Sequence, residues 1–166
     1  IQSGDFYVDI YYKDQVATGT TLFFDQLNAG AYRLVELNMR GETVWQYAIP
    51  SSYLATSTIG LDVEKLSNGN YLFLTGTGIH EVSDAGALRW SYATTKVSHD
   101  VQRLPNGDTL WNFGNSDSYN DAGTNAQMMR VNDAGVVVWS WYAKDHIAND
   151  GIFDQGWTHA NAVLWQ

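Results

Sequence analysis

The chain has 166 residues, of which 45% are apolar and only 16% are charged, with a net charge of −9 and no cysteine. This composition predicts a folded domain with a buried core, and it excludes disulfides and thiolate metal sites. No cluster of Lys and Arg interrupts the acidity, which argues against nucleic acid and against an anionic membrane as partners. No apolar run reaches the ~18 residues of a membrane span.

The predicted secondary structure consists of short strands without a sustained helical period, in units of four strands that we name A to D in chain order. A first unit contributes strands B, C and D, expected at 20–25, 32–38 and 43–49. A second unit is complete and spans 61–93, with strands near 61–66, 70–75, 78–83 and 87–93. A third spans 99–142 with a long polar insert at 115–125, and residues 159–166 supply strand A of a fourth.

Two sequence repeats define these units. In three copies, a turn glycine is followed by a tryptophan four residues later and by an aromatic residue two beyond that: Gly41-Trp45-Tyr47, Gly86-Trp90-Tyr92 and Gly135-Trp139-Trp141. Because side chains alternate along a strand, each aromatic pair shares one face. We expect the three tryptophans to occupy equivalent outer-strand positions and to be largely buried between neighbouring units.

The second repeat is an Asn-Gly turn between two alternating runs, at Asn68-Gly69 and at Asn106-Gly107. This dipeptide is the strongest short signal of a β-hairpin, because both residues accept a positive φ. A four-stranded unit of ~40–50 residues has the size of a propeller blade. The sequence therefore predicts an all-β fold of β-propeller blades, each with four antiparallel strands.

The number of blades is too small for a closed ring. Closed propellers have ~4–8 blades, whereas residues 1–166 supply two complete blades and two partial ones. We therefore expect a single propeller domain that is open or is part of a larger propeller. Its open edges are expected to be covered by missing blades or by another chain.

Four stretches resemble the arylsulfotransferase family in sequence and in order: 17–22 (ATGTTL), 41–45 (GETVW), 99–108 (HDVQRLPNGD) and 156–163 (GWTHANAV). The resemblance implies a six-bladed propeller, usually exported, that moves a sulfuryl group between phenols through a sulfated histidine. No nucleotide donor or other cofactor is implied, and the ligand is a small phenol or aryl sulfate. The low lysine content also favours a secreted, periplasmic or extracellular location. Later active-site residues of the family would follow Gln166, so the chain alone is not assumed to be active.

His99 and His159 are the candidate catalytic residues. Each stands at the start of a strand A, five residues before a leucine that we align as core, Leu104 or Leu164. Strand A is the innermost strand of a propeller blade, so both rings are expected to face one polar funnel. Neutral imidazole is a competent nucleophile and base near pH 7. The alternative is that each histidine caps a strand by bonding neighbouring carbonyls.

Asn161, Arg103 and Asp100 are the candidate substrate-binding residues, and no metal site is expected. Asn161 shares a strand face with His159, and its alternative is a hydrogen bond between blades. Asp100 can fix a histidine tautomer, but Asp62 recurs at its place, which favours a structural role. Arg103 is the cation nearest His99, although Lys65 at the matching position suggests a solvated face.

Two other functions compete with sulfuryl transfer. A non-catalytic extracellular propeller, used for binding or for edge-to-edge assembly, fits the missing blades and open edges. A quinoprotein-like dehydrogenase shares the Gly-x-x-x-Trp turns, but the chain lacks the cation-binding and cofactor-clamping residues that this function needs.

Overall fold

The computed structural model describes residues 18–27, 30–54, 62–112, 128–142, 145–146 and 162–165. Within these ranges the chain is all-β, as predicted, with a short 3₁₀ helix, η2 (Ser51–Tyr53), and no α-helix. None of this part of the chain forms a helix long and apolar enough to cross a membrane.

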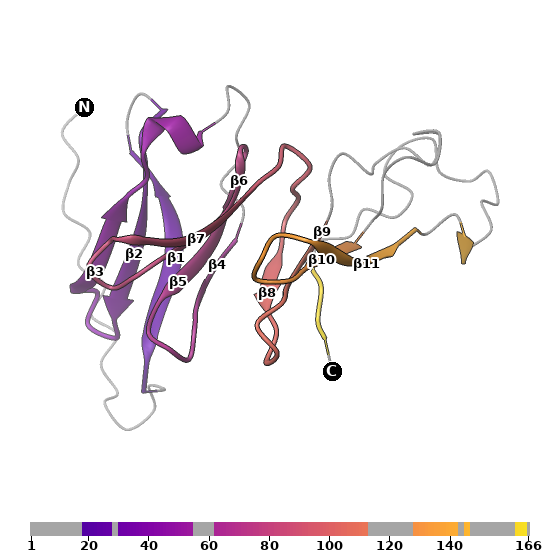
Figure 1. The fold of residues 1–166 in the computed structure, drawn as a ribbon. Helices are drawn as coiled ribbons and strands as arrows, with labels where there is room; N and C mark the ends of the chain where they lie inside the picture. The colour runs from indigo at the N-terminus through magenta and orange to yellow at the C-terminus, as the bar shows by residue number, and fades with distance from the viewer. Residues whose placement is uncertain are drawn as a thin grey trace, which may run out of the picture.

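The strands form three antiparallel sheets that follow one another along the chain (Figure 1). Blade 1 consists of β1 (Thr20–Gln26), β2 (Tyr32–Asn38) and β3 (Thr43–Ala48). Blade 2 consists of β4 (Val63–Lys65), β5 (Tyr71–Thr75), β6 (Gly78–Val82) and β7 (Leu88–Ala93). Blade 3 consists of β8 (Val101–Arg103), β9 (Thr109–Asn112), β10 (Met128–Val131) and β11 (Val137–Trp141). Each sheet joins strands in chain order, which is the topology of a propeller blade and confirms the predicted fold class.

Both predicted Asn-Gly hairpins are present. Gly69 and Gly107 have φ of +84° and +91°, a region that favours glycine. In the first turn Leu66 N–H donates to the Asn70 carbonyl at 2.8 Å, and the Asn68 side chain accepts the Asn70 N–H at 3.0 Å. The asparagine therefore fixes the turn with its side chain while the glycine supplies the positive φ.

The hydrophobic core lies between the blades. One cluster joins blades 1 and 2 and another joins blades 2 and 3, with members that include Leu34, Phe73 and Val82 in the first, and Leu72, Ile79 and Trp111 in the second. Because blade 2 is covered on both faces, all five residues of β5 and all five of β6 are buried. A strand buried on both faces is continuously apolar rather than alternating, as in the Tyr-Leu-Phe-Leu run of β5.

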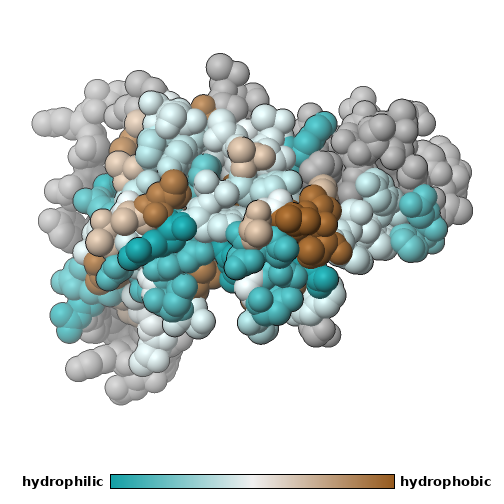
Figure 2. All heavy atoms as spheres, viewed as in Figure 1, coloured by the Kyte–Doolittle hydropathy of each residue, from teal (hydrophilic) through white to brown (hydrophobic). Residues whose placement is uncertain are grey.

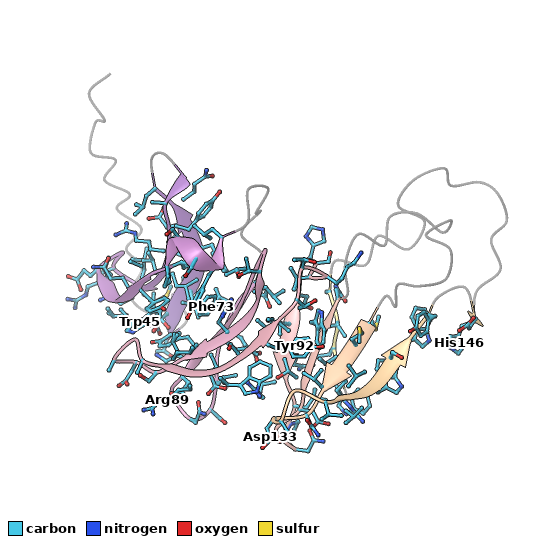
Figure 3. All side chains as sticks on the ribbon, turned by 45° about the horizontal axis from the view of Figure 1, so that its top comes forward. Trp45, Phe73, Arg89, Tyr92, Asp133 and His146 are labelled. Atoms are coloured by element: carbon cyan, nitrogen blue, oxygen red, sulfur yellow. The ribbon has the colours of Figure 1, made fainter. Side chains whose placement is uncertain are left out.

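The outer-strand tryptophans occupy equivalent positions, and each is partly buried and packed against a core cluster, in keeping with the prediction. Two of them reach from the outermost strand of one blade to the turn of the next. Trp45 Nε1–H donates to the Asp84 carbonyl at 2.7 Å, and Trp90 Nε1–H donates to the Asp133 carbonyl at 2.8 Å. Figure 3 shows Trp45 at the junction of blades 1 and 2, and Asp133 at the hairpin end of blade 3. Trp45 and Trp90 thus join the outermost strand of each blade to the blade that follows.

Gly78, at the start of β6, is the position where a side chain is least acceptable. Its φ is +157°, and an added Cβ would clash with the Tyr92 carbonyl oxygen of β7. We predict that Gly78→Ala destabilises the protein by about 3 kcal/mol, because rigid backbone has to move. The control is Gly69→Ala, where the added Cβ meets open space and only the φ strain of about 1–2 kcal/mol applies. Urea unfolding measures the free energy of unfolding of both variants, and an equal decrease in the two would contradict the clash.

Candidate functional site

The inner edge of the blades is the region to which the sequence assigns the functional residues. Leu74 N–H of β5 donates to the Asp62 carbonyl, and Asn112 N–H of β9 donates to the Asp100 carbonyl. In an antiparallel pair, successive residues turn their N–H groups to opposite sides. The N–H group of Val101, one residue after Asp100, therefore points away from its own sheet, toward the inner edge.

Side chains of the preceding blade satisfy these inner N–H groups. Val101 N–H donates to Asp62 Oδ2 at 3.2 Å, and Arg103 N–H donates to Glu64 Oε1 at 2.7 Å. The carboxylates of Asp62, which precedes β4, and of Glu64, which is on β4, thus bind the backbone of β8. They take the role that a neighbouring strand would have in a continuous sheet. Buried backbone groups require such partners, and a side-chain acceptor supplies them without merging the two sheets.

The same pattern repeats after blade 3. Val163 N–H donates to Asp100 Oδ2, and Trp165 N–H donates to Gln102 Oε1 at 2.9 Å. Residues 162–165 therefore run along the inner edge of blade 3 as β8 runs along blade 2. The predicted innermost position of this segment is supported by these bonds.

Each inner strand also sends a cation back to the preceding blade. Lys65 Nζ donates to both carboxylate oxygens of Glu36 at 2.9 Å, and Thr20 and Tyr71 donate their hydroxyls to the same group. Burial raises the pKa of Glu36, but the hydrogen bonds from Thr20, Tyr71 and Lys65 outweigh it and leave the pKa below its usual value. Glu36 is thus a buried, ionised anchor for blade 2.

Arg103 makes the equivalent contact between blades 2 and 3. Its Nη2 lies 2.7 Å from Glu81 Oε2, its Nη1 donates to the Gly107 carbonyl at 3.0 Å, and the guanidinium lies 4.7 Å from the centre of the Trp90 ring. The Arg103 and Glu81 side chains are only 15% and 10% exposed. Burial lowers the pKa of the Arg103 guanidinium, and the carboxylate of Glu81 opposes that shift. The suggested solvated face is therefore wrong: this cation is largely buried against the preceding blade.

At the junction of blade 3 with residues 162–165, the residue that corresponds to Glu81 is positively charged. Arg130 of β10 stands opposite Trp139, as Glu81 of β6 stands opposite Trp90, so a cation replaces the carboxylate. Its guanidinium lies 5.1 Å from the centre of the Trp165 ring. Cation–π contact thus takes the place of the ion pair at this junction.

These contacts place Trp165 at the repeat position of Arg103, which corrects the predicted alignment by two residues. Leu164 was aligned with the core residue Leu104, but Leu164 is 70% exposed whereas Leu104 is 4% exposed, and Val163 is the buried residue of the segment. Both leucines match a pattern of apolar residues, but hydrogen bonds to the neighbouring strand decide the register. His159 lies outside the described residues, so its predicted equivalence to His99 stays a prediction.

The structure places three of the five predicted site residues. His99 is exposed and immediately precedes Asp100, whose half-buried carboxylate accepts the Val163 N–H. Arg103 lies at the other end of β8, about 13 Å along the strand from His99. The structure therefore separates His99 from the predicted cation. His159 and Asn161, like the insert at 115–125, lie outside the described residues.

A cleft of about 590 Å³ opens between blades 2 and 3 at the Arg103 end of β8. Both Asn-Gly hairpins and the β10–β11 turn contribute to its wall, which includes Glu64, Lys65, Asn68, Pro105 and Asp133. The cleft and His99 thus lie at opposite ends of β8. Among the described residues, no group of three or more His, Asp or Glu side chains is arranged to hold a metal ion.

Two titratable groups outside the predicted site residues have shifted pKa values. His80 is 5% exposed, its ring stacks 4.0 Å from that of Tyr53, and its Nε2 lies 3.0 Å from Thr75 Oγ1. Burial lowers the pKa of His80 to about 4, so it is a neutral core residue. Asp62 is the second: burial raises its pKa to about 6, and a hydrogen bond with Asp100 and that residue's charge add to the rise. The recurrence of aspartate at 62 and 100 is the sequence signal that favours a structural role at this position.

The fold and its inner edge define a repeat protein built of propeller blades. The family model of arylsulfotransferases (ASST) matches residues 12–166, and the chain therefore belongs to the arylsulfotransferase family. None of the curated proteins matches the chain. Among solved structures, a protein of unknown function from Bacteroides caccae is similar, with a TM-score of 0.33 and 14% identity over 80% of this chain and 71% of that one.

The ion pairs predict different costs for removing their cations. Arg103→Met should destabilise the protein by about 2–4 kcal/mol, because it leaves the buried Glu81 carboxylate without its cation. Lys65→Met is the matched control and should cost about 1 kcal/mol, because Lys65 is 47% exposed and Glu36 keeps two hydroxyl donors. Equal small losses in urea unfolding would show that Arg103 does not hold the junction.

Proposed function

We propose that this chain belongs to a propeller that moves a sulfuryl group between phenolic compounds through a histidine. Membership of the arylsulfotransferase family is the observation that carries the proposal. The position of His99 just before an innermost strand supports it, since the inner edges of blades face the propeller axis. His159 and His99 are the proposed catalytic residues.

The proposed chemistry has two displacement steps. An imidazole nitrogen attacks the sulfur of an aryl sulfate, the N–S bond forms, the S–O bond to the aryl group breaks, and the phenoxide leaves and takes up a proton. The oxygen of an acceptor phenol then attacks the sulfur and loses its proton, so that a new S–O bond forms, the N–S bond breaks and the free imidazole is regenerated. Donors placed at the sulfuryl oxygens stabilise the charge that develops in each step.

Asn161, Asp100 and Arg103 remain the proposed substrate-binding residues. The bonds of Asp100 and Arg103 in the described part of the chain hold inner strands to their neighbours. Their contribution to binding therefore includes fixing where the inner strands lie. No cofactor is required by the proposed steps.

The domain organisation, the location and the partners of the chain form the second part of the proposal. We propose one propeller domain or part of one, in a secreted, periplasmic or extracellular location, with no nucleic-acid or membrane partner. The face of blade 3 that carries Trp139 and Trp165 is the counterpart of faces that blades 1 and 2 bury. Further blades, from a longer chain or from another chain, would cover it.

One observation favours the alternative of non-catalytic binding or edge-to-edge assembly. Val136, Val137 and Val138 at the start of β11 are 57%, 45% and 43% exposed. Figure 2 shows an apolar patch over the β10–β11 hairpin. Uncharged outer edges of sheets are sites where further strands add.

Turnover of phenyl sulfate with a phenol acceptor tests the proposal, in the longest natural chain that contains these residues. We expect His159→Ala to lower turnover by about 10³-fold or more, and His99→Ala to lower it strongly as well, because a methyl group replaces neither nucleophile nor charge. His146→Ala is the control, since this exposed ring stacks on Trp141 and is expected to leave turnover unchanged.

A second readout is the mass of the quenched enzyme, which should carry one sulfuryl group in the natural protein and none in the nucleophile variant. Unchanged turnover in both histidine variants would contradict sulfuryl transfer through either residue. Loss of turnover without any sulfated intermediate would contradict the two-step route.

A further inference from the structure

The outermost strands of the three blades differ in the charge that they carry at their outer edge. β3, β7 and β11 each end their sheet, so each has an outer side without a strand partner among the described residues. Between the turn glycine and the tryptophan, blade 1 has the exposed Glu42 and blade 2 has the exposed Arg89 (Figure 3). Residues 136–138 of blade 3 are all valine, and β11 contains no charged residue.

The exposure of these valines belongs to the rim of the blade and not to the uncovered face of blade 3. Val137 and Val138 are 45% and 43% exposed. Their counterparts at the same distance from the turn glycine, Leu88 and Val44, are 51% and 52% exposed, although another blade follows each of theirs. A further blade would therefore cover the face that carries Trp139 and leave the start of β11 open.

Charged side chains at the edge of a sheet keep strands of other molecules from adding to it. Glu42 and Arg89 have this effect in blades 1 and 2, because pairing of two copies would bring like charges together. A β-bulge also disfavours pairing at an edge, but all three blades have one at the equivalent place. The absence of charge is therefore what distinguishes the outer edge of β11 from those of β3 and β7.

We propose that β11 is the edge through which two copies of this chain associate, with their β11 strands antiparallel about a two-fold axis near Val138. A two-fold axis brings a strand against itself, and an uncharged strand of branched and aromatic side chains is complementary to itself. A charged partner fits less well, because β11 offers it no charge to bind. This inference rests on the alternative of edge-to-edge assembly, whose partner it names, and does not depend on sulfuryl transfer.

The size and charge of the chain determine how such a dimer behaves. A stable interface uses about 20–30 residues of each partner, whereas β11 has five, so the dimer is weak and forms at high protein concentration. The net charge of −9 on each copy opposes association. Salt screens this repulsion and leaves the apolar contact intact, so the dimer becomes more stable as the salt concentration rises.

Sedimentation equilibrium of the longest natural chain that contains these residues tests the proposal. We expect monomers at about 10 μM and a dimer fraction that grows up to about 1 mM, more so in high salt than in low salt. Val138→Lys should raise the dissociation constant by about tenfold or more, because two lysines then meet at the axis. Val44→Lys is the matched control, with the same change at the same repeat position, and should leave the constant unchanged. Both positions are exposed, so both variants should keep the natural melting temperature.

Disulfide crosslinking gives a second test that adds no charge. Residues 1–166 contain no cysteine, so an introduced thiol has no competitor in this part of the chain. Opposed residues of antiparallel strands have Cα atoms about 4.5–5.5 Å apart, which is within reach of a disulfide. Val138→Cys should therefore form a covalent dimer under mild oxidation, and Val44→Cys should form one about tenfold more slowly or not at all.

Three outcomes would overturn the proposal. They are a natural protein that stays monomeric at about 1 mM, equal crosslinking of the two cysteine variants, and self-association that Val138→Lys leaves unchanged. The last outcome would exclude β11 as the contact but leave assembly through another surface standing. Turnover of phenyl sulfate is measured separately, and its result bears on sulfuryl transfer alone.

Discussion

The arrangement of the blades depends on side chains of one inner strand accepting the backbone N–H groups of the next. A sheet that ends at an inner edge leaves a row of unpaired donors, and main-chain pairing there would merge neighbouring blades into one sheet. Asp62 and Glu64 satisfy these donors on β8, and Asp100 and Gln102 satisfy them on residues 162–165. The blades therefore stay separate sheets while their inner edges remain joined.

The other contacts between blades follow from this inner attachment. Once the edges are joined, the cation of each inner strand reaches the carboxylate of the preceding blade, and the rim tryptophan reaches the next turn. Because the core also lies between blades, each blade is stabilised chiefly by its neighbours, as in other repeat proteins. A catalytic side chain carried just before an inner strand, as His99 is, takes its position from this shared network rather than from its own blade.

The sequence predicts the strands, the hairpins and the class of fold because local chemistry determines them. Asn68-Gly69 and the glycine-to-tryptophan spacing suffice to place turns and strands in each blade. The register of the last segment could not be obtained in this way, because Val163 and Leu164 are equally apolar, and only acceptors on a distant strand select between them. The burial of Arg103 was missed for the same reason: its partner Glu81 is 22 residues away in the chain. Contacts between blades are invisible to patterns within one blade.

Amide hydrogen exchange at Arg103 tests the inner attachment most directly. The Arg103 N–H group is bonded to the Glu64 side chain and to no strand of its own sheet on that side. Replacing Glu64 by alanine should lower the protection of the Arg103 amide by about tenfold or more, since the acceptor is lost. Protection of the Leu110 amide, inside blade 3, should change much less. Unaltered protection of the Arg103 amide in Glu64→Ala would contradict the claim that side chains of one blade hold the inner backbone of the next.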